Sequence, residues 1–367
     1  MSDLRVIKLA KVLVNYSLGI KPGQKMHISA SPIAKDLTLA VYEEAINAGA
    51  HVFLEQPLEE QLELFYKFAS DEQLDFVSPV RKLVVETFDA DLGIDASPNR
   101  RMLSAVDPKR MARSAKARTE IMKAFLDRSA RGELHWCFTV YPNNANAQDA
   151  DMSLRDYTEF VFAAGMLNDA DPAVFWKAEG ERQKKLVAWL KGRDNVILKG
   201  SNIDMTFSIK DRTFEPCDGK MNFPDGEIFT GPVEDSANGW VRFNYPAIFM
   251  GQEINDIELW FENGKVVREK ASKNQGLLTS TLNTDDGARY LGEWGIGTNY
   301  GITKFTKDML FDEKIGGTIH FAVGAGYPET GSKNDSAIHW DMLCDMAESE
   351  VTVDNDLFYK DGKTVVG

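Results

Sequence analysis

The last third of the chain carries a histidine and an aspartate at a spacing that suits a shared metal ion. His339 and Asp341 stand two residues apart in the run Ile-His-Trp-Asp. In an extended strand, side chains two residues apart project from the same face. An imidazole nitrogen and a carboxylate oxygen would then point at one divalent cation. On its own, this short pattern is a weak signal of metal binding.

The chain has only five histidines, so the position of each is informative. His320 lies between two apolar residues in the glycine-rich run GGTIHFAVGAG. A polar ring in such a strand is typical of a site that backbone approaches closely. A buried structural histidine explains the pattern about as well. For His27, His51 and His135, which lie in predicted strands of the first half, we expect packed or surface side chains.

Two glutamates lie among glycine and aromatic residues, where burying an unpaired charge is costly. Glu227 is in NFPDGEIFTGP, and Glu293 follows GARYLG. A buried carboxylate needs a positive partner. A metal ion would serve, and so would a lysine or an arginine such as Arg289. The residues alone leave both alternatives open.

Several other chemistries lack their short motifs. The sequence contains no G-x-x-x-x-G-K-[ST], no H-E-x-x-H and no G-x-S-x-G, and its glycine runs miss the last glycine of G-x-G-x-x-G. These motifs would mark a phosphate loop, a zinc-binding helix, a serine nucleophile and a dinucleotide fold, respectively. Their absence argues against enzyme classes that are built on them.

The charge of the chain disfavours polyanionic partners. The 367 residues include 42 Lys plus Arg and 56 Asp plus Glu, which gives a net charge of -14. Such a field repels nucleic acid and anionic membranes and attracts cations, including metal ions and peptide N-termini. The same balance also keeps an ordinary cytosolic protein soluble. We therefore predict no nucleic-acid partner and no membrane partner.

Cysteine usage and the N-terminus favour a cytoplasmic protein. Cys137, Cys217 and Cys344 are widely separated and odd in number, which argues against a disulfide framework or a thiolate zinc site. The first residues mix charges into apolar positions, unlike a signal peptide. No uncharged stretch approaches the length of a membrane-spanning helix.

The first half has the pattern of a layered α/β domain. Strand, helix and strand joined by short connections predict a crossover unit, and therefore a parallel sheet. Ser153, with Asp156 three residues later, predicts a helix start with a capping box in which Asp replaces Glu. We expect helices over 4–18, 36–48, 156–167 and 171–192, and strands over 25–31, 51–55 and 133–142.

The pattern of apolar and polar residues changes after about residue 195. Alternating runs joined by polar and glycine turns predict strands, and Asn263-Gly264 predicts a hairpin. The segment 284–297 begins like a short helix and then loosens into glycines. We predict an α/β N-terminal domain over 1–195, with a Rossmann-like layered parallel sheet. A strand-rich α+β C-terminal domain over 196–367 would carry the metal site.

Four blocks of the second half resemble the thermophilic aminopeptidase T family of dinuclear metallo-aminopeptidases, as a leucyl-aminopeptidase-like member. The blocks are NFPDGEIFTGPVEDS, LNTDDGARYLGEWGIGTNYG, LFDEKIGGTIHFAVGAGYPETG and NDSAIHWDM. They occur in the family's order, and IKPGQKMHIS, MSLRDYTEFVF and DPAVFW extend the resemblance over nearly the whole chain. The family is described as homodimeric, with an α/β domain followed by a strand-rich domain.

The resemblance implies a role for each matching residue. The family's metal ligands fall on Glu227, Glu293, His320, His339 and Asp341. A family tyrosine thought to assist catalysis matches Tyr327 in G-A-G-Y-P. All six residue types are retained. The connection between Tyr327 and His339 is shorter than in the family, which puts the side-chain preference in doubt more than the chemistry.

Three carboxylates and two imidazoles suit two divalent ions that share a bridging carboxylate and a water, typically ~3.5–4 Å apart. Zinc, cobalt and manganese all fit this donor set. The bound water would attack the first peptide carbonyl, with Tyr327 donating to the oxyanion. Glu293 or Glu227 is preferred over Asp341 as the base. The substrate would be a peptide with a free N-terminus, and the assembly a homodimer.

Two rival functions stay open from the residues alone. One is a dinuclear hydrolase of non-peptide amides or acylated small molecules. The other is a metal- or peptide-binding relative that lacks turnover. Retention of all six positions argues against the second rival.

Overall fold

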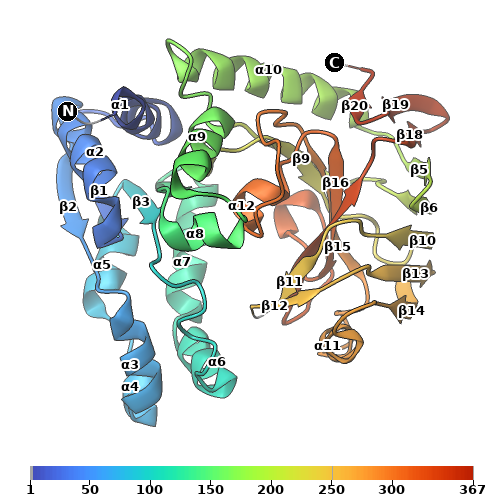
Figure 1. Ribbon diagram of the computed structural model, residues 1–367, viewed down its shortest axis with the longest axis horizontal. Helices are drawn as coiled ribbons and strands as arrows, with labels where there is room; N and C mark the ends of the chain where they lie inside the picture. Colours follow the sequence, from blue (N-terminus) through green and yellow to red (C-terminus); the bar gives the residue numbers. More distant parts are fainter. Residues whose placement is uncertain (1–2, 250, 367) are drawn as a thin grey trace. The chain divides into compact units, whose positions relative to one another are not determined.

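A computed structural model describes residues 3–249 and 251–366, and the chain divides into two compact units (Figure 1). The first unit comprises the described residues up to Ala173 together with Gly219–Pro224. The second comprises Val174–Asp218 and the described residues from Asp225 onward. The domain boundary at residue 195 concerns autonomous folding and stays a prediction.

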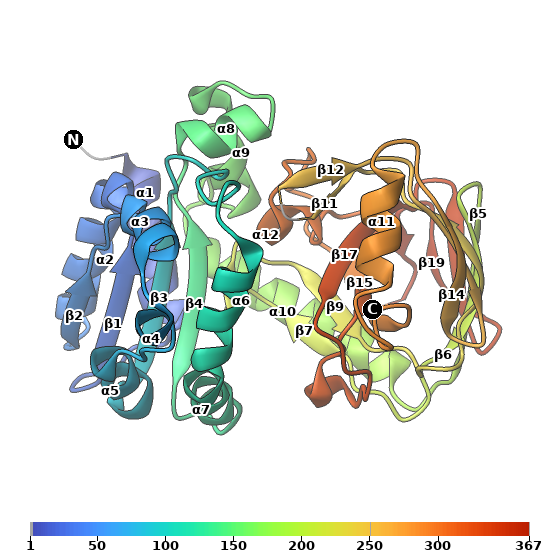
Figure 2. The same ribbon diagram turned by 90° about the horizontal axis from the view of Figure 1, so that it is seen from below.

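The first unit is built on a five-stranded sheet in the order β2-β1-β3-β4-β8. All of its strand pairs are parallel, as predicted from the crossover pattern. Figure 2 shows β1, β3 and β4 side by side with helices against the sheet. The strands are β1 (Lys25–Ala30), β2 (His51–Glu55), β3 (Ala90–Asp95), β4 (His135–Val140) and β8 (Asn222–Phe223).

Helix α2 (Lys35–Asn47) connects β1 to β2 and has the apolar face that its sequence predicts. Leu37, Val41 and Ala45 are fully buried at helical spacing. Gly49 follows the helix with φ +86°, a backbone conformation that glycine adopts without steric cost. The chain therefore turns sharply into β2, and the crossover stays short.

Two helices differ in detail from the expectation. The helix predicted over 4–18 is α1 (Leu4–Lys11), which continues as a π-helix, η1 (Val12–Ser17). Helix α9 (Leu154–Ala164) begins at Ser153, whose Oγ accepts from Asp156 N at 3.1 Å and donates to the Asp156 carboxylate at 2.8 Å. The short aspartate side chain meets the hydroxyl, so only half of the predicted capping box forms.

The remaining helices of the first unit cover its sheet and connections. They are η2 (Pro32–Ala34), α3 (Glu60–Phe68), α4 (Asp71–Leu74), α5 (Pro79–Thr87), α6 (Pro108–Ala117), α7 (Thr119–Ala130) and α8 (Asn144–Asp149). Helix α10 (Pro172–Leu190) starts at the end of the first unit and lies mainly in the second.

The second unit contains two large antiparallel sheets. The five-stranded sheet has the order β17-β16-β15-β9-β7, and the eight-stranded sheet the order β14-β13-β10-β6-β5-β18-β19-β20. The first consists of β7 (Glu215–Cys217), β9 (Glu227–Thr230), β15 (Leu291–Gly297), β16 (Thr318–Gly324) and β17 (His339–Asp345). The second consists of β5 (Asn195–Gly200), β6 (Ile203–Ser208), β10 (Asn238–Arg242), β13 (Glu258–Glu262), β14 (Lys265–Lys270), β18 (Ser349–Val353), β19 (Asp356–Lys360) and β20 (Lys363–Thr364).

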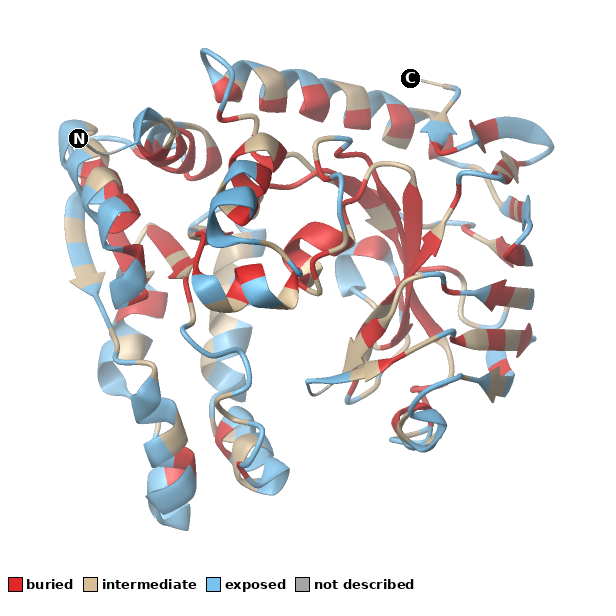
Figure 3. Ribbon diagram, viewed as in Figure 1, coloured by how far each residue is buried: buried red, intermediate tan, exposed pale blue. Residues whose placement is uncertain are grey.

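One apolar core joins these two sheets. The ring of Phe207 on β6 contacts Trp294 on β15 and Phe321 on β16, with centroid distances of 5.1 and 5.9 Å. Figure 3 shows β15 and β16 buried along their length. The smaller elements of this unit are the β11 (Ala247–Phe249) and β12 (Gln252–Ile254) pair, α11 (Gln275–Leu282), α12 (Met309–Asp312) and η3 (Pro328–Thr330). The predicted strand-rich architecture is confirmed.

The hairpin prediction is confirmed, whereas the prediction for 284–297 is wrong, because residues 284–289 form bends and turns rather than a short helix. Asn263 and Gly264 both have positive φ, at 48° and 81°, and join β13 to β14 as a two-residue turn. Residues 291–297 form strand β15 rather than the loose end of a helix. Strand β15 pairs with β16 on one side and β9 on the other, so long-range pairing decides its conformation.

Within the described ranges, no helix is both long enough and apolar enough to cross a bilayer.

Candidate metal centre

Four neighbouring strands of the five-stranded sheet bring the predicted ligands together. Strand β17 contributes His339 and Asp341, β16 contributes His320, β15 contributes Glu293 and β9 contributes Glu227. These residues lie up to 114 positions apart in the chain, from 227 to 341. The order of the strands in the sheet makes them neighbours.

The register of the strands puts these side chains on one face of the sheet. His320 pairs with Gly295, and Gly297 pairs with Glu227. Since alternate residues of a strand share a face, Glu293, Gly295 and Gly297 lie on the same side. His339 and Asp341 therefore project from one face of their strand, as predicted. The same face of the sheet carries His320.

The absence of a side chain at Gly295 makes room for the imidazole of His320. A Cβ placed on Gly295 would lie 1.9 Å from Cε1 and 2.0 Å from Nε2 of His320. The ring therefore rests directly on the backbone of β15. This is the close backbone approach that the glycine-rich run predicted.

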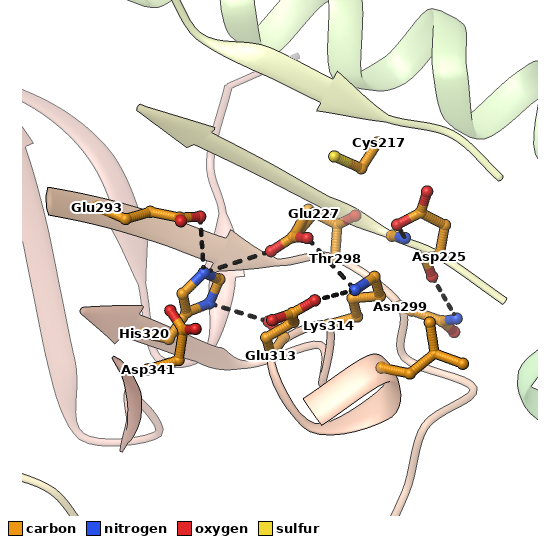
Figure 4. Close-up of polar contacts among 12 residues, drawn as sticks. Cys217, Asp225, Glu227, Glu293, Thr298, Asn299, Glu313, Lys314, His320 and Asp341 are labelled. Carbon is orange, nitrogen blue, oxygen red and sulfur yellow. Dashed lines mark hydrogen bonds and ion pairs between the residues drawn. The ribbon is translucent and has the colours of Figure 1, made fainter. Parts of the chain in front are cut away.

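Glu227, Glu293 and His320 form one buried cluster, shown in Figure 4. His320 Nε2 lies 3.2 Å from Glu293 Oε1 and 3.4 Å from Glu227 Oε2. The three residues are at most 5% exposed. Two carboxylate oxygens and one imidazole nitrogen thus converge at a spacing that suits a cation.

Glu293, His339 and Asp341 form a second cluster that shares Glu293 with the first. His339 Nε2 lies 3.2 Å from Glu293 Oε2 and 3.5 Å from Asp341 Oδ2. Each oxygen of Glu293 therefore faces a different histidine. A carboxylate that is shared between two ligand sets suits a two-metal site.

The other nitrogen of each imidazole is tied to a backbone carbonyl. His320 Nδ1 lies 3.1 Å from Glu313 O, and His339 Nδ1 lies 2.7 Å from Ala325 O. With Nδ1–H donating to a carbonyl, the lone pair of the neutral ring is on Nε2, inside the cluster. Metal-binding histidines are usually oriented in this way.

Each cluster also contains a buried carboxylate oxygen that lacks a hydrogen-bond donor. Within the described part of the chain, Glu227 Oε2 and Asp341 Oδ1 are both buried and accept no hydrogen bond. Buried acceptors are normally satisfied, so such atoms call for an explanation. A cation in each cluster would supply the missing partner, and the residues present therefore fit a metal pair.

The charges of the cluster depend strongly on one another. Burial favours the neutral acid at Glu293, but hydrogen bonds from His320 and His339 outweigh it and lower the Glu293 pKa to about 2. Burial also disfavours charged histidine, yet the hydrogen bonds to Glu293 and the neighbouring carboxylates raise the pKa of His320 to about 10 and that of His339 to about 9. Without metal, the protons on His320 and His339 supply the positive charge that offsets the carboxylates.

The outer two carboxylates are less well compensated than Glu293. Burial raises the pKa of Asp341 to about 6 despite the nearby His339. Burial likewise raises the pKa of Glu227 well above its ordinary value, although Lys314 and His320 oppose this. Added positive charge in each cluster would reverse both shifts.

Tyr327 lies at the edge of this cluster. Its ring is 5.0 Å from that of His339 and 5.4 Å from that of Phe229, and the residue is 39% exposed. Burial of its hydroxyl and the carboxylates of Glu293 and Asp341 raise the Tyr327 pKa above its ordinary value. The phenol therefore keeps its proton and remains a hydrogen-bond donor at neutral pH.

Three further residues that sequence reasoning did not single out border the first cluster. Lys314 is fully buried, with Nζ 3.4 Å from Glu227 Oε1. Cys217 and Asp225 offer ligand atoms within 4.8 Å of those of Glu227 and of each other. Lys314 stands in one of the family-like blocks, but no spacing signal distinguishes a buried lysine from a surface one.

The sequence left open whether a lysine or an arginine pairs with the two site glutamates. Lys314 does pair with Glu227. Arg289 pairs with Glu269 at 3.1 Å rather than with either site glutamate. The other histidines behave as expected, since His51 and His135 are exposed and His27 is buried against Asp91 at 2.8 Å.

Comparison with known proteins places the chain in a family. Residues 2–365 match the family described as thermophilic metalloprotease (M29). Aminopeptidase 2 of Geobacillus stearothermophilus is 27% identical, with 97% of this chain and 94% of the relative covered. Aminopeptidase T of Thermus thermophilus is 24% identical, with 97% and 95% covered.

A solved structure has the same fold over the full length. Wild-type AmpT from Thermus thermophilus superimposes with a TM-score of 0.85 at 23% identity, covering 99% of both chains. The resemblance inferred from the residue blocks is confirmed by these matches. The chain belongs to the thermophilic metalloprotease (M29) family.

Proposed function

We propose that this metalloprotease is an aminopeptidase that removes the first residue of peptides with a free N-terminus. Its relatives in Geobacillus stearothermophilus and Thermus thermophilus are named aminopeptidases. The observation that carries the proposal is the sharing of Glu293 by two clusters of potential metal ligands on one sheet face. We propose that Glu227, Glu293, His320, His339 and Asp341 hold two divalent ions, with zinc, cobalt and manganese as candidates.

When bound, such ions lower the pKa of a coordinated water toward neutrality and polarise the scissile carbonyl. The protein contributes orientation and proton transfer. The backbone carbonyls of Glu313 and Ala325 fix the two imidazoles, so that Nε2 of each faces Glu293. Gly295 leaves the space in which the His320 ring lies.

Tyr327 is the proposed donor to the developing oxyanion. Its phenol stays protonated because burial and the neighbouring carboxylates raise its pKa. Its ring packs against His339, which places it beside the second cluster. Contacts of this kind contribute about 3–4 kcal/mol to transition-state stabilisation in other enzymes.

Glu293 is the proposed carrier of the proton from the attacking water to the leaving amine, with Glu227 as the alternative. Glu293 lies between both clusters and is ionised at neutral pH, so it can accept a proton there. Glu227 has the higher pKa but shares its Oε1 with Lys314. Asp341 belongs to the second cluster and not to the first, so it is the less favoured base.

The proposal also includes how the enzyme attracts the free amine of its substrate and how its chains assemble. The net charge of -14 attracts a cationic peptide N-terminus. We further propose a homodimer, which sedimentation equilibrium would test.

The test of the proposed function compares two leucine anilides. We expect cleavage of the anilide with a free α-amine, no cleavage of its N-acetyl analogue, and loss of activity with a chelator that zinc or cobalt restores. Equal cleavage of both anilides would point to a general amide hydrolase. Full activity in chelator would contradict the metal-dependent proposal.

A further inference from the structure

Lys314 carries a buried ammonium group that the proposed reaction leaves without a role. The residue is 0% exposed, and its Nζ contacts carboxylates of Glu227 and Glu313 (Figure 4). A buried ammonium is costly unless anions surround it. The position of this charge is therefore set by the acidic groups that face it.

The backbone holds Lys314 firmly in place. Lys314 N donates to Phe311 O at 3.1 Å, and Lys314 O accepts from Asn299 N at 3.0 Å. Gly316 N also donates to Asn299 O at 3.0 Å. The side chain thus starts from a fixed point after α12 and reaches Glu227 from the side opposite His320, as Figure 4 shows.

A third group of ligand atoms includes Glu227, the carboxylate that the ammonium contacts. Cys217 on β7 pairs directly with Glu227 on β9, and Asp225 lies two residues before Glu227. Their ligand atoms lie within 4.8 Å of one another. One thiol and two carboxylates at this spacing would suit a divalent transition metal. Lys314 supplies positive charge to this group, since it interacts electrostatically with all three residues.

We propose that the Lys314 ammonium acts as a built-in cation that occupies this third position and keeps metal out of it. The inference rests on the proposed two-metal function and limits it to the other two positions. Lys314 is thus a positioning residue that acts through Glu227. It engages Oε1 at 3.4 Å and leaves Oε2, which faces His320 at 3.4 Å, for the first cluster.

The test removes the ammonium and asks whether cobalt takes its place. Lys314→Ala opens space beside Cys217, Asp225 and Glu227. Cobalt titration of this variant should bind one more ion per chain than the wild type. Cys217 would release its proton and give a thiolate-to-cobalt charge-transfer band that the wild type lacks. A merely structural role for Lys314 would not produce this band.

Matched variants assign the signal. Lys314→Met fills the space without the charge, so we expect neither the extra ion nor the band. Adding Cys217→Ser to Lys314→Ala should abolish the band, whereas adding Cys344→Ser, at a buried thiol elsewhere in the same unit, should leave it. A folded Lys314→Ala variant with wild-type cobalt stoichiometry and no band would overturn the proposal.

Loss of fold is also informative. If Lys314→Ala unfolds without metal, it and Lys314→Ser are produced in cobalt-containing medium, where the added ion should replace the ammonium and restore the fold. Failure of both variants to fold with cobalt would overturn the proposal. Wild-type protein that binds no cobalt would instead refute the two-metal function, whereas the band in Lys314→Ala tests the third position separately.

Discussion

Glu293 is the residue on which both halves of the proposed centre depend. Its two oxygens face His320 and His339 at 3.2 Å each, and it is 5% exposed. Breaking a buried charge pair by removing one partner typically costs about 3–5 kcal/mol, because the other charge stays buried. Metal ions in place of the histidine protons would keep this carboxylate compensated.

Metal binding should therefore displace protons. The pKa values of about 10 for His320 and about 9 for His339 mean that both rings are protonated at pH 7 without metal. Only neutral imidazole binds a metal, so apparent affinity should rise with pH until about pH 9–10. Calorimetric titration in buffers of different ionisation enthalpy should report about two protons released by the histidines at pH 7. An affinity that is flat between pH 6 and 9 would contradict this.

Tyr327→Phe should separate catalysis from metal binding. The phenol is the proposed oxyanion donor and not a ligand, so the variant should keep its metal content. We expect kcat to fall by about 10²–10³-fold with KM changed little. Steady-state kinetics and metal analysis check this, with the exposed Tyr42→Phe as control. Normal turnover by Tyr327→Phe would remove the oxyanion assignment.

At the residue scale, the sequence predicts which side chains form the site better than it predicts which residues surround them. His339 and Asp341 share a face because strand geometry alone requires it. The pairing of Glu227 with Lys314 depends on the loop after α12 folding back to Asn299. Such a long-range contact has no local signal, so Lys314 was not predicted.

The element that organises the centre is one face of the five-stranded sheet. Its strands β9, β15, β16 and β17 carry the clustered side chains, while the other face packs Trp294 and Phe321 against Phe207. A rigid, buried sheet fixes ligands more precisely than loops do. The apolar core thus holds the proposed ligands in place from behind.

Gly295→Ala tests this dependence on close strand packing. The added Cβ would meet the His320 ring at 1.9 Å, so the imidazole must move away from Glu293. We expect metal affinity to fall by about 10–100-fold, as seen when groups that orient a ligand are changed. Gly276→Ala, where no described atom lies within 4 Å of the added Cβ, serves as control. Wild-type affinity in Gly295→Ala would show that His320 is not held as described.

Elements with strong local patterns were predicted well. Helix α2 and the Asn263-Gly264 hairpin follow from apolar spacing and turn chemistry. Strand β15 was missed because its three glycines have low strand propensity, and pairing with β16 and β9 overrides that preference. The strand that carries Glu293 was therefore the hardest to predict.

On the scale of the whole molecule, the chain combines a parallel-sheet unit with an antiparallel unit, which carries all the candidate ligands found among the described residues. The strand-helix-strand pattern of the first half and the hairpin pattern of the second predicted these architectures. Crossover units require parallel strands, and hairpins require antiparallel ones. The order of the strands within the five-stranded sheet did not follow from the sequence. It depends on pairing across long segments of chain.

Metal should stabilise the folded protein measurably. A ligand present at 100 times its Kd contributes about 2.7 kcal/mol. For a unit of about 150–250 residues, this corresponds to a Tm increase on the order of 5–10 °C. Differential scanning calorimetry of chelated and zinc-loaded protein checks the increase. His339→Ala should show a smaller one, and an equal increase in that variant would place the stabilising metal elsewhere.

The most direct test of the central claim is a crystal soaked with zinc or cobalt and measured at the absorption edge of the metal. We predict two anomalous peaks ~3.5–4 Å apart, one within bonding distance of Glu227, Glu293 and His320 and the other of Glu293, His339 and Asp341. Peaks that avoid the Glu293 carboxylate, or a fully active crystal without any peak on this sheet face, would contradict the account.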